Sequence, residues 1–380
     1  MIARAETAEE DGARNDLAAP PPLNVTCLFV RRPHFGQHSG IQQLVRHLDP
    51  AKVRVTARPV SDHDGDLPSR WPWRSTRSRN ALRRVVSSVG PGWYKLSDFA
   101  AEMAIAPAWW RFETKILHFI DGEHTANLLP WLAQHVRSRG RTVATYHQAP
   151  RLLSRLVPWP VIERLDHVVL VAESQRSWFE QVLPPDRVSV ILHGVDAQFF
   201  HPVPRHASRT VRCLVVGSYL RDWKLLAGIA DAMRDDPSMV FDVVSSSAPR
   251  FTSPSVSVHQ HISDEALRDI YQRADILLLP LEDATANNAL VEGMASGLPV
   301  IGSDLPSLRE YAGTAGNFVE HRVDAFVEAI RTFARDADLR ARLGCVARTR
   351  AEALSWPNVA GMYEALYERV ATRGRGVLAS

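Results

Sequence analysis

Residues 275–304, DILLLPLEDATANNALVEGMASGLPVIGSD, decide the fold of this chain. Short apolar runs at the two ends of the stretch flank a segment whose apolar residues recur at helical spacing. A strand, a loop, a helix and a second strand in that order predict one unit of a parallel α/β sheet. We expect Asn288 to cap the helix and Gly297 to end it.

The same alternation of strands and helices runs along the chain in two series, each about the size of one domain. The predicted fold class is therefore α/β, with two Rossmann-like doubly wound domains facing a cleft. The expected strands are 24–31, 53–60, 115–124, 142–150, 166–174 and 188–196 in the first series, and 210–219, 241–247, 275–280 and 298–304 in the second. The expected boundaries are a flexible tail at 1–22, a first domain at 23–200, a linker at 201–209, a second domain at 210–355 and a terminal helix at 356–373 that packs back toward the first domain.

Length and composition fit an ordinary two-domain globular protein. The chain has 380 residues, a formal net charge of +3 and a pI near 8.9, which is too mildly basic to indicate nucleic-acid binding. Its three cysteines, Cys27, Cys213 and Cys345, lie far apart and lack metal-site spacing. No apolar run approaches the ~20 residues that span a bilayer. We expect a cytoplasmic protein.

Glu292 is a lone carboxylate in an apolar run. An ionised carboxylate removed from water costs several kcal/mol unless something pairs with it. Either Glu292 is solvated, as most helical glutamates are, or it faces a ligand. We place it opposite the apolar stripe formed by Leu290, Val291 and Met294, at the carboxyl ends of the strands. A carboxylate there could accept hydrogen bonds from the adjacent hydroxyls of a sugar such as ribose.

Two cations flank a strand-to-helix junction in GSYLRDWKLL, residues 217–226. Arg221 and Lys224 oppose the helix dipole at this position, which makes sense if a diphosphate lies between them. The alternative is a solvated charged pair with Asp222 as its local partner. Neither first turn carries the glycine pattern G-x-G-x-x-G, so a standard NAD site is not indicated.

These residues resemble a known family. The sequence resembles retaining glycosyltransferases of family 4, whose GT-B fold joins two Rossmann-like domains. The strongest resemblance covers 263–310, with SDEALRDIYQRADILLLP, NNALVEGMASGLPVIGSD and Glu310. Weaker resemblances follow in the family's order along nearly the whole chain from residue 24: HSGIQQLVRHL, TVATYHQAP, ILHGVDAQFFHP and a terminal YEALYERV helix.

The resemblance implies roles for individual positions. Glu292 matches the glutamate that holds the ribose of a nucleotide-sugar, and Arg221 and Lys224 match the basic pair on the donor diphosphate. His147 is similar to the histidine near the transferred sugar, so the expected catalytic residues are His147, Arg221 and Lys224. The remaining expected donor-binding residues are Ser39, Gly40, Gly217, His261, Ile262, Thr285, Asn287 and Asn288.

The sequence also departs from the family pattern. The first glutamate of the paired motif should lie eight positions before Glu292, where this chain has Ala284. Glu282 and Asp283 are out of register. We expect Asn287 and Asn288 to replace the missing hydrogen bonds to the donor sugar. His193 stands where asparagine is customary.

The expected reaction moves a sugar from a nucleoside-diphosphate-sugar to an acceptor hydroxyl, with retention of anomeric configuration. Fixed cations and helix amides would stabilise the leaving diphosphate, so no metal and no further cofactor are expected. His34 and His38 lie four apart in a loop and are interpreted as incidental.

The acceptor is the least defined partner: a glycan, a glycolipid or a small molecule, but no nucleic acid. His118, Asp121 and Glu123 end a strand and could serve the acceptor side or be structural. The Trp- and Arg-rich stretch 70–84 could meet anionic lipid at the inner face of a membrane, or it could be a solvated basic helix.

Three alternatives stay open at this point. A nucleotide-sugar epimerase or a phosphorylase could use the same fold and donor residues. A non-catalytic sugar-binding member is the second, because Ala284 replaces a glutamate. A membrane- or nucleic-acid-binding protein that uses the basic stretch is the third.

Overall fold

The structure, a computed structural model, describes residues 21–32, 36–62, 75–111, 113–135, 140–204 and 208–373. Several expectations fall outside these ranges: nearly all of the N-terminal tail, His34, the part of the basic stretch before residue 75, and residues 205–207 of the expected linker.

The first half of the chain forms a six-stranded parallel sheet in the order β2-β1-β3-β4-β5-β6. Its strands are β1 (Leu23–Arg31), β2 (Val53–Ser61), β3 (Ile116–Phe119), β4 (Arg141–Tyr146), β5 (His167–Leu170) and β6 (Val188–Val190). Its helices are η1 (Ile41–Gln43), α1 (Leu44–His47), α2 (Thr76–Val89), α3 (Leu96–Trp110), α4 (Gly122–Thr125), α5 (Leu128–His135), α6 (Pro150–Leu156), α7 (Trp159–Glu163), η3 (Glu173–Gln175), α8 (Arg176–Phe179) and η4 (Pro185–Arg187).

The second half repeats the plan with a six-stranded parallel sheet in the order β12-β11-β10-β7-β8-β9. Its strands are β7 (Val211–Val216), β8 (Met239–Val244), β9 (Val256–His259), β10 (Ile276–Leu279), β11 (Val300–Ser303) and β12 (Gly316–Val319). Its helices are α9 (Trp223–Ala232), α10 (Asp264–Arg273), α11 (Asn288–Ala295), α12 (Pro306–Ala312), η5 (Gly313–Ala315), α13 (Val323–Arg335) and α14 (Ala337–Ala353).

The prediction of two doubly wound α/β units is confirmed. The ten expected strands are all present, and most of them are runs of β-branched and apolar residues that are buried in the parallel sheets, whereas β2 at the edge of the first sheet is largely exposed. The helices were predicted less well. The sequence also predicts helices over IQQLVRHL, residues 41–48, and SQRSWFEQVL, residues 174–183. The first is a 3-10 turn followed by only four α-helical residues, and the second is similarly short. The pattern analysis also missed other elements, among them β9, β12, α3, α13 and α14.

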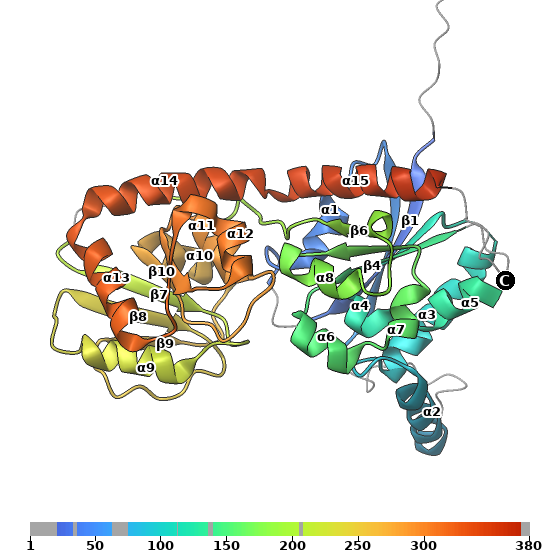
Figure 1. Cartoon of the computed structure of the whole chain (residues 1–380), viewed down its shortest axis with the longest axis horizontal. Coiled ribbons are helices and arrows are strands. Elements are labelled where there is room, and N and C mark those ends of the chain that lie inside the picture. Colours follow the sequence, from blue (N-terminus) through green and yellow to red (C-terminus); the bar gives the residue numbers. More distant parts are fainter. Residues whose placement is uncertain are drawn as a thin grey trace, which may run out of the picture.

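Two helices at the end of the chain connect the sheets. Figure 1 shows α14 over the second unit and α15 (Trp356–Thr372) continuing in nearly the same direction over the first. Where they meet, Val195 pairs with Ser355, and its carbonyl accepts from the amide of Trp356 at 3.1 Å. The segment after β6 and the junction of the two helices therefore meet at the boundary between the units.

The sequence of the terminal helix predicts an apolar stripe of Met362, Leu366 and Val370, and the buried face of α15 differs from it. Leu366 and Val370 are buried with Tyr363 and Tyr367 against β1, β3 and β4. Met362 is 51% exposed, so its expected place in the core is wrong. Spacing of four residues drifts around a 3.6-residue helix, and the face that packs follows 359, 363, 366 and 370.

This face gives a matched pair of substitutions. Leu366→Ala is expected to lower the free energy of unfolding by about 2–5 kcal/mol, because it opens a cavity between α15 and the first sheet. Met362→Ala should change it by less than about 0.5 kcal/mol. Urea denaturation of both variants checks the assignment, and equal losses would contradict the packing of α15.

Each sheet has one point at which the strand order reverses. In the first sheet it lies between β1 and β3, and in the second between β7 and β10. In open α/β sheets, ligands bind outside the carboxyl ends of the strands at this point. A ligand-binding site is therefore expected at the loops after β1, β3, β7 and β10.

Candidate functional site

The loops after β7 and β10 are joined by backbone hydrogen bonds. The amide of Asp222 donates to Pro280 O at 3.0 Å, and that of Glu282 donates to Leu220 O at 3.1 Å. Gly217 has a φ of 95°, which favours glycine, and a Cβ there would lie 3.1 Å from a guanidinium nitrogen of Arg221. The β7 turn therefore leaves room for that side chain at the switch point of the second sheet.

Arg221 is a buried cation whose hydrogen-bond partners are all neutral. Its Nε donates to Val216 O at 3.0 Å, and its terminal nitrogens reach Val216 O, Tyr219 O at 3.3 Å and Asn287 Oδ1 at 3.5 Å. Burial lowers the pKa of Arg221 to about 10. Among the described residues no carboxylate pairs with it. A buried guanidinium with only neutral acceptors still lacks a counter-ion.

Lys224 lies in the first turn of α9, as predicted, and its side chain is exposed. The local partner expected for the two cations is different, however. Asp222 caps α9 by accepting from the amide of Leu225 at 2.9 Å, and its other oxygen contacts Nε2 of His321 at 2.8 Å. Asp222 therefore neutralises neither Arg221 nor Lys224.

Glu292 is buried at the boundary between the two units. Its Oε1 accepts from the hydroxyl of Ser39 at 2.6 Å, and its Oε2 accepts from the hydroxyl of Tyr271 at 2.9 Å. Burial raises the pKa of Glu292 to about 7, and the two hydroxyls oppose that rise. Glu292 is thus not a solvated helix residue, and one of its two partners comes from the other unit.

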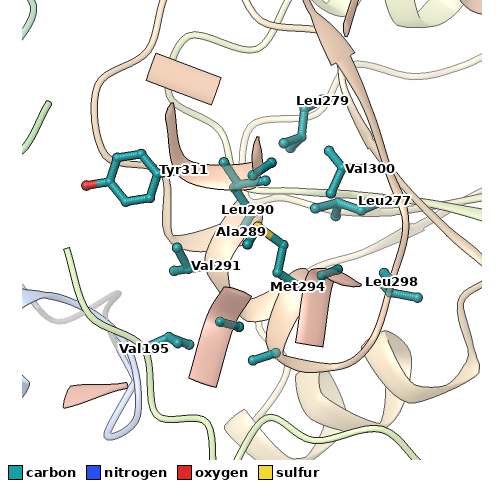
Figure 2. Close-up of a cluster of buried hydrophobic side chains, with 14 of the residues drawn as sticks. Val195, Leu277, Leu279, Ala289, Leu290, Val291, Met294, Leu298, Val300 and Tyr311 are labelled. Atoms are coloured by element: carbon teal, nitrogen blue, oxygen red, sulfur yellow. The ribbon is translucent and has the colours of Figure 1, made fainter. Parts of the chain in front are cut away.

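The surroundings of Glu292 differ from the predicted polar face. Every residue of α11 after Asn288 is buried, with Leu290 and Met294 packed against the strands (Figure 2). The helix is capped by Asn287 rather than by Asn288, since Asn287 Oδ1 accepts from the amide of Leu290 at 3.2 Å. That oxygen is committed to the cap and to Arg221, which weakens its expected role as a substitute for the missing glutamate.

The loop before η1 reaches the second unit at more than one point. The amide of Gln37 donates to Asp264 Oδ2 at 2.6 Å, beside the bond from Ser39 to Glu292. Gly40 follows with a φ of 87° and precedes η1, so this loop turns sharply at the contact. The loop that carries Ser39 and Gly40 therefore lies against the second unit.

The β4 loop also contacts the second unit. The hydroxyl of Thr285 donates to His147 O, and that of Tyr219 donates to Gln148 Oε1 at 3.0 Å. The structure therefore brings His147, Thr285, Arg221 and Glu292 to one boundary.

His147 is oriented by its own unit. Its Nε2 lies 2.7 Å from Ile120 O and carries the proton of that bond, so Nδ1 is left as the acceptor of the neutral ring. Glu123 accepts from the amides of His147 and Gln148. Glu123 is buried and holds the turn that carries His147, which is a structural role.

Two further residues expected on the acceptor side have different environments. His118 is fully buried between Tyr367 and Thr145, at 2.7 and 2.8 Å, and burial lowers its pKa to about 3. It faces α15, which favours the structural alternative for this residue over a place on the acceptor side. Asp121 accepts from the amide of Val30 at 2.8 Å and joins the loops after β1 and β3.

The remaining expected donor residues lie around the same edge of the second sheet. His261 is exposed and Ile262 partly buried in the turn between β9 and α10, and Asn288 is partly exposed at the start of α11. Ala284 is buried, and its carbonyl accepts from the hydroxyl of Ser307 at 2.7 Å. The position of the missing glutamate is thus filled by packing.

Sequence analysis missed residues whose partners are distant in the chain. Tyr271 contacts Glu292 across 21 positions. Tyr311 donates to Val171 O at 2.6 Å and accepts from the amide of His193 at 2.8 Å, and both partners belong to the first half of the chain. Tyr271 lies on the buried side of an amphipathic helix, where periodicity predicts only burial.

Part of the chain matches a known protein family. Residues 197–336 match the model of the family Glycosyl transferases group 1. This segment holds Arg221, Lys224 and Glu292, so the resemblance noted for 263–310 is confirmed.

A curated relative and two solved structures extend the comparison. The D-inositol 3-phosphate glycosyltransferase of Corynebacterium glutamicum (strain R) is 23% identical over 216 residues, 48% of this chain and 52% of the relative. The chain thus spans about half the length of the curated relatives that it matches first. Sucrose-phosphate synthase from Thermosynechococcus elongatus superposes with a TM-score of 0.69 at 17% identity, covering 92% of this chain and 99% of that one. Anabaena Alr3699/HepE in complex with UDP gives 0.63 at 11% identity, with 91% and 100% covered.

These likenesses establish that the two units form a GT-B fold. Within the described residues, no helix is long and apolar enough to cross a membrane. The same residues contain no cluster of acidic, histidine or cysteine side chains that could hold a metal ion.

Proposed function

We propose that this chain is a glycosyltransferase that moves a sugar from a nucleoside-diphosphate-sugar to an acceptor hydroxyl. The anomeric configuration would be retained, and no metal would be needed at the diphosphate. The family match over the second unit and the GT-B fold support the reaction class.

The observation that carries the proposal is the state of Arg221. A guanidinium buried at the switch point, with neutral oxygens as its partners, is suited to a di-anionic group. Lys224 adds a second positive charge one helical turn away, and the first amides of α9 point toward the same edge. Together they would stabilise the charge that develops on the departing diphosphate.

Glu292 would hold the ribose of the donor. In the present arrangement Ser39 and Tyr271 already occupy its two oxygens. Tyr271 belongs to the same unit as Glu292, whereas Ser39 belongs to the other, so a small separation of the units frees one oxygen. A ribose hydroxyl would then take the place of the Ser39 hydroxyl.

His147 would face the transferred sugar. Its ring is fixed by Ile120 O and leaves Nδ1 as an acceptor, while Tyr219, Gln148 and Thr285 lie beside it. With Ala284 in place of a glutamate, these neighbours are the candidates to recognise the sugar hydroxyls.

The acceptor would enter at the carboxyl edge of the first sheet. Arg32 reaches Asp121 at 3.4 Å and Nε2 of His124 at 3.3 Å, and Lys95 pairs with Asp62 at 2.7 Å nearby. Arg32 and Asp121 lie on the loops after β1 and β3, at the switch point of that sheet, and Asp62 directly follows β2 beside them. A polar acceptor with several hydroxyls or an anionic group fits them.

A product assay tests the proposal. The chain is incubated with UDP-, GDP- and dTDP-linked sugars, with and without candidate acceptors such as inositol phosphates, and released nucleoside diphosphate is measured. Release that depends on the acceptor and persists in EDTA is expected, and NMR of the product should show the anomeric configuration of the donor. Interconversion of the donor sugar without release would instead identify an epimerase, and release that requires inorganic phosphate a phosphorylase.

A further inference from the structure

Three neighbouring helices of the first unit expose apolar side chains. Of the large hydrophobic residues exposed among those described, Val85 on α2 is 61% exposed, Met103 and Trp110 on α3 are 47% and 41%, and Trp131 on α5 is 42%. Helix α3 contacts both α2 and α5, so the three helices are adjacent. We name the outward sides of α2, α3 and α5 the α2–α3–α5 surface.

Helix α3 is the least expected part of this surface. Its buried side includes Leu96, Ile105 and Trp109, yet the exposed side is also apolar, with Met103, Pro107 and Trp110 one turn apart. A helix that is apolar all round is normally covered on both sides or lies against lipid. Nothing among the described residues covers the second side of α3.

The charge of the surface has one sign. Helix α2 carries Arg77, Arg79, Arg83 and Arg84 and no acidic residue. The two acids of α3 are both turned inward: Asp98 accepts from the amide of Lys95, and Glu102 accepts from the hydroxyl of Tyr94 and from amides at the start of α5. Helix α5 has no acid. Glu113, which follows α3, lies 3.8 Å from Arg111.

We propose that the α2–α3–α5 surface docks on an anionic lipid bilayer. The arginines of α2 would attract the negative surface, and Met103, Trp110, Trp131 and Val85 would enter the interface between headgroups and acyl chains. Tryptophan is favoured at that depth because its ring is apolar and its N–H can still reach water. Helix α2 projects beyond the rest of the first unit, where a flat surface can reach it (Figure 1).

The same chemistry favours lipid over nucleic acid. A protein surface binds the phosphate backbone of a nucleic acid through cations alone. Stacking on single-stranded bases also needs aromatic side chains placed between those cations. Here most of the exposed apolar area lies on α3 and α5, apart from the arginines, and includes methionine and valine, which do not stack on bases.

The docking surface lies beside the proposed acceptor entrance. Lys95, whose side chain is tied to Asp62 at the end of β2, directly precedes α3. A bilayer on the α2–α3–α5 surface would therefore bring lipid headgroups toward the carboxyl edge of the first sheet. The docking itself does not depend on the proposed reaction.

Vesicle sedimentation tests the proposal with the full chain and no substrate. Phosphatidylcholine vesicles with and without phosphatidylglycerol are the probes, and binding is expected only with the anionic lipid. The double variant Arg77→Gln/Arg84→Gln should bind about 30-fold more weakly, since each interfacial arginine is worth about fivefold. The double variant Met103→Ser/Trp110→Ser should lose at least about tenfold, including at high salt, because its loss is not electrostatic.

Matched controls use residues elsewhere on the surface. Arg331→Gln/Arg335→Gln on α13 removes the same charge, and Met362→Ser on α15 removes an equally exposed methionine. Both should bind like the native chain, and all variants should keep its melting temperature, since the substituted side chains are exposed. The proposal is overturned if anionic vesicles are not bound, if the α2 and α3 variants bind like the controls, or if duplex DNA is bound while vesicles are not.

Discussion

Arg221→Gln should lower kcat/KM for the donor by about 10²–10³-fold, because it removes the buried cation that would oppose the charge on the leaving diphosphate. The loss should fall mainly on kcat, since that charge grows in the transition state. Steady-state release of nucleoside diphosphate, with the acceptor held constant, measures it. Lys224→Gln should have a smaller effect, because its ammonium is exposed and its charge is screened by water.

The Arg221 substitution also affects stability, and the two effects must be separated. The guanidinium donates to Val216 O and Tyr219 O, so its loss leaves buried carbonyls without donors, at about 1–3 kcal/mol. Arg221→Lys keeps the charge but not the fork of donors, and should recover part of the rate without the full stability. Arg331→Gln is the control for charge alone. An Arg221→Gln variant that is folded and keeps native kcat would refute the role of this residue.

Glu292→Gln should make the protein more stable at neutral and higher pH and yet weaken donor binding. Burial raises the pKa of Glu292 from 4.5 to about 7, so the native state has to ionise a carboxyl that prefers its proton. A pKa difference of that size corresponds to roughly 3 kcal/mol of unfolding free energy. Glutamine is neutral and carries no such penalty, but it loses the ionised acceptor, which should weaken nucleoside diphosphate binding by about 10–100-fold.

The pH dependence has a definite direction. The folded-state pKa of Glu292 lies above its unfolded value, so the native state holds more protons than the unfolded state between the two values. The contribution of this group to stability is therefore largest below about pH 4.5 and decreases as the pH rises to about 7. Subtracting the native from the variant stability isolates the group from Glu102 and Asp98, whose pKa values burial also raises.

Urea denaturation of both proteins at about pH 5 and about pH 8 measures this difference. The advantage of Glu292→Gln should grow between the two conditions. An advantage that is constant across pH would mean that Glu292 titrates normally and is not held in a dry contact with Ser39 and Tyr271.

The fold was predictable because its signals are local. Short apolar runs rich in β-branched residues identify the buried strands. The order of strand, loop, helix and strand in 275–304 is typical of a parallel α/β sheet. Helices α3 and α14 lack a clear apolar stripe, since α3 is apolar on most sides and α14 is mostly polar. Helix α13 does carry such a stripe, with Phe326, Ile330 and Phe333 buried on one side, and the sequence analysis overlooked it.

The residues of the candidate site could be predicted from the sequence, but the contacts between them could not. Arg221 and Glu292 can be identified in the sequence, because a cation at a helix start and a lone carboxylate in an apolar run are unusual. The contacts of Glu292 cannot, because they join positions 253 and 21 residues apart. The environment of His118 could not be predicted from the sequence for a related reason. A strand residue points to one of two faces, and which face α15 covers cannot be deduced from β3 alone.

The central claim is that Arg221 and Glu292 bind the two ends of one nucleoside diphosphate. Calorimetry with the whole nucleotide and with each of its two parts tests this claim most directly. The native chain, Arg221→Gln and Glu292→Gln are titrated with UDP, GDP and dTDP, with the matching nucleosides, and with pyrophosphate. We predict that Arg221→Gln loses pyrophosphate and nucleotide binding but keeps the nucleoside, and that Glu292→Gln loses nucleoside and nucleotide binding but keeps pyrophosphate. Equal losses of every ligand in both variants, or no heat with any nucleotide in the native chain, would contradict it.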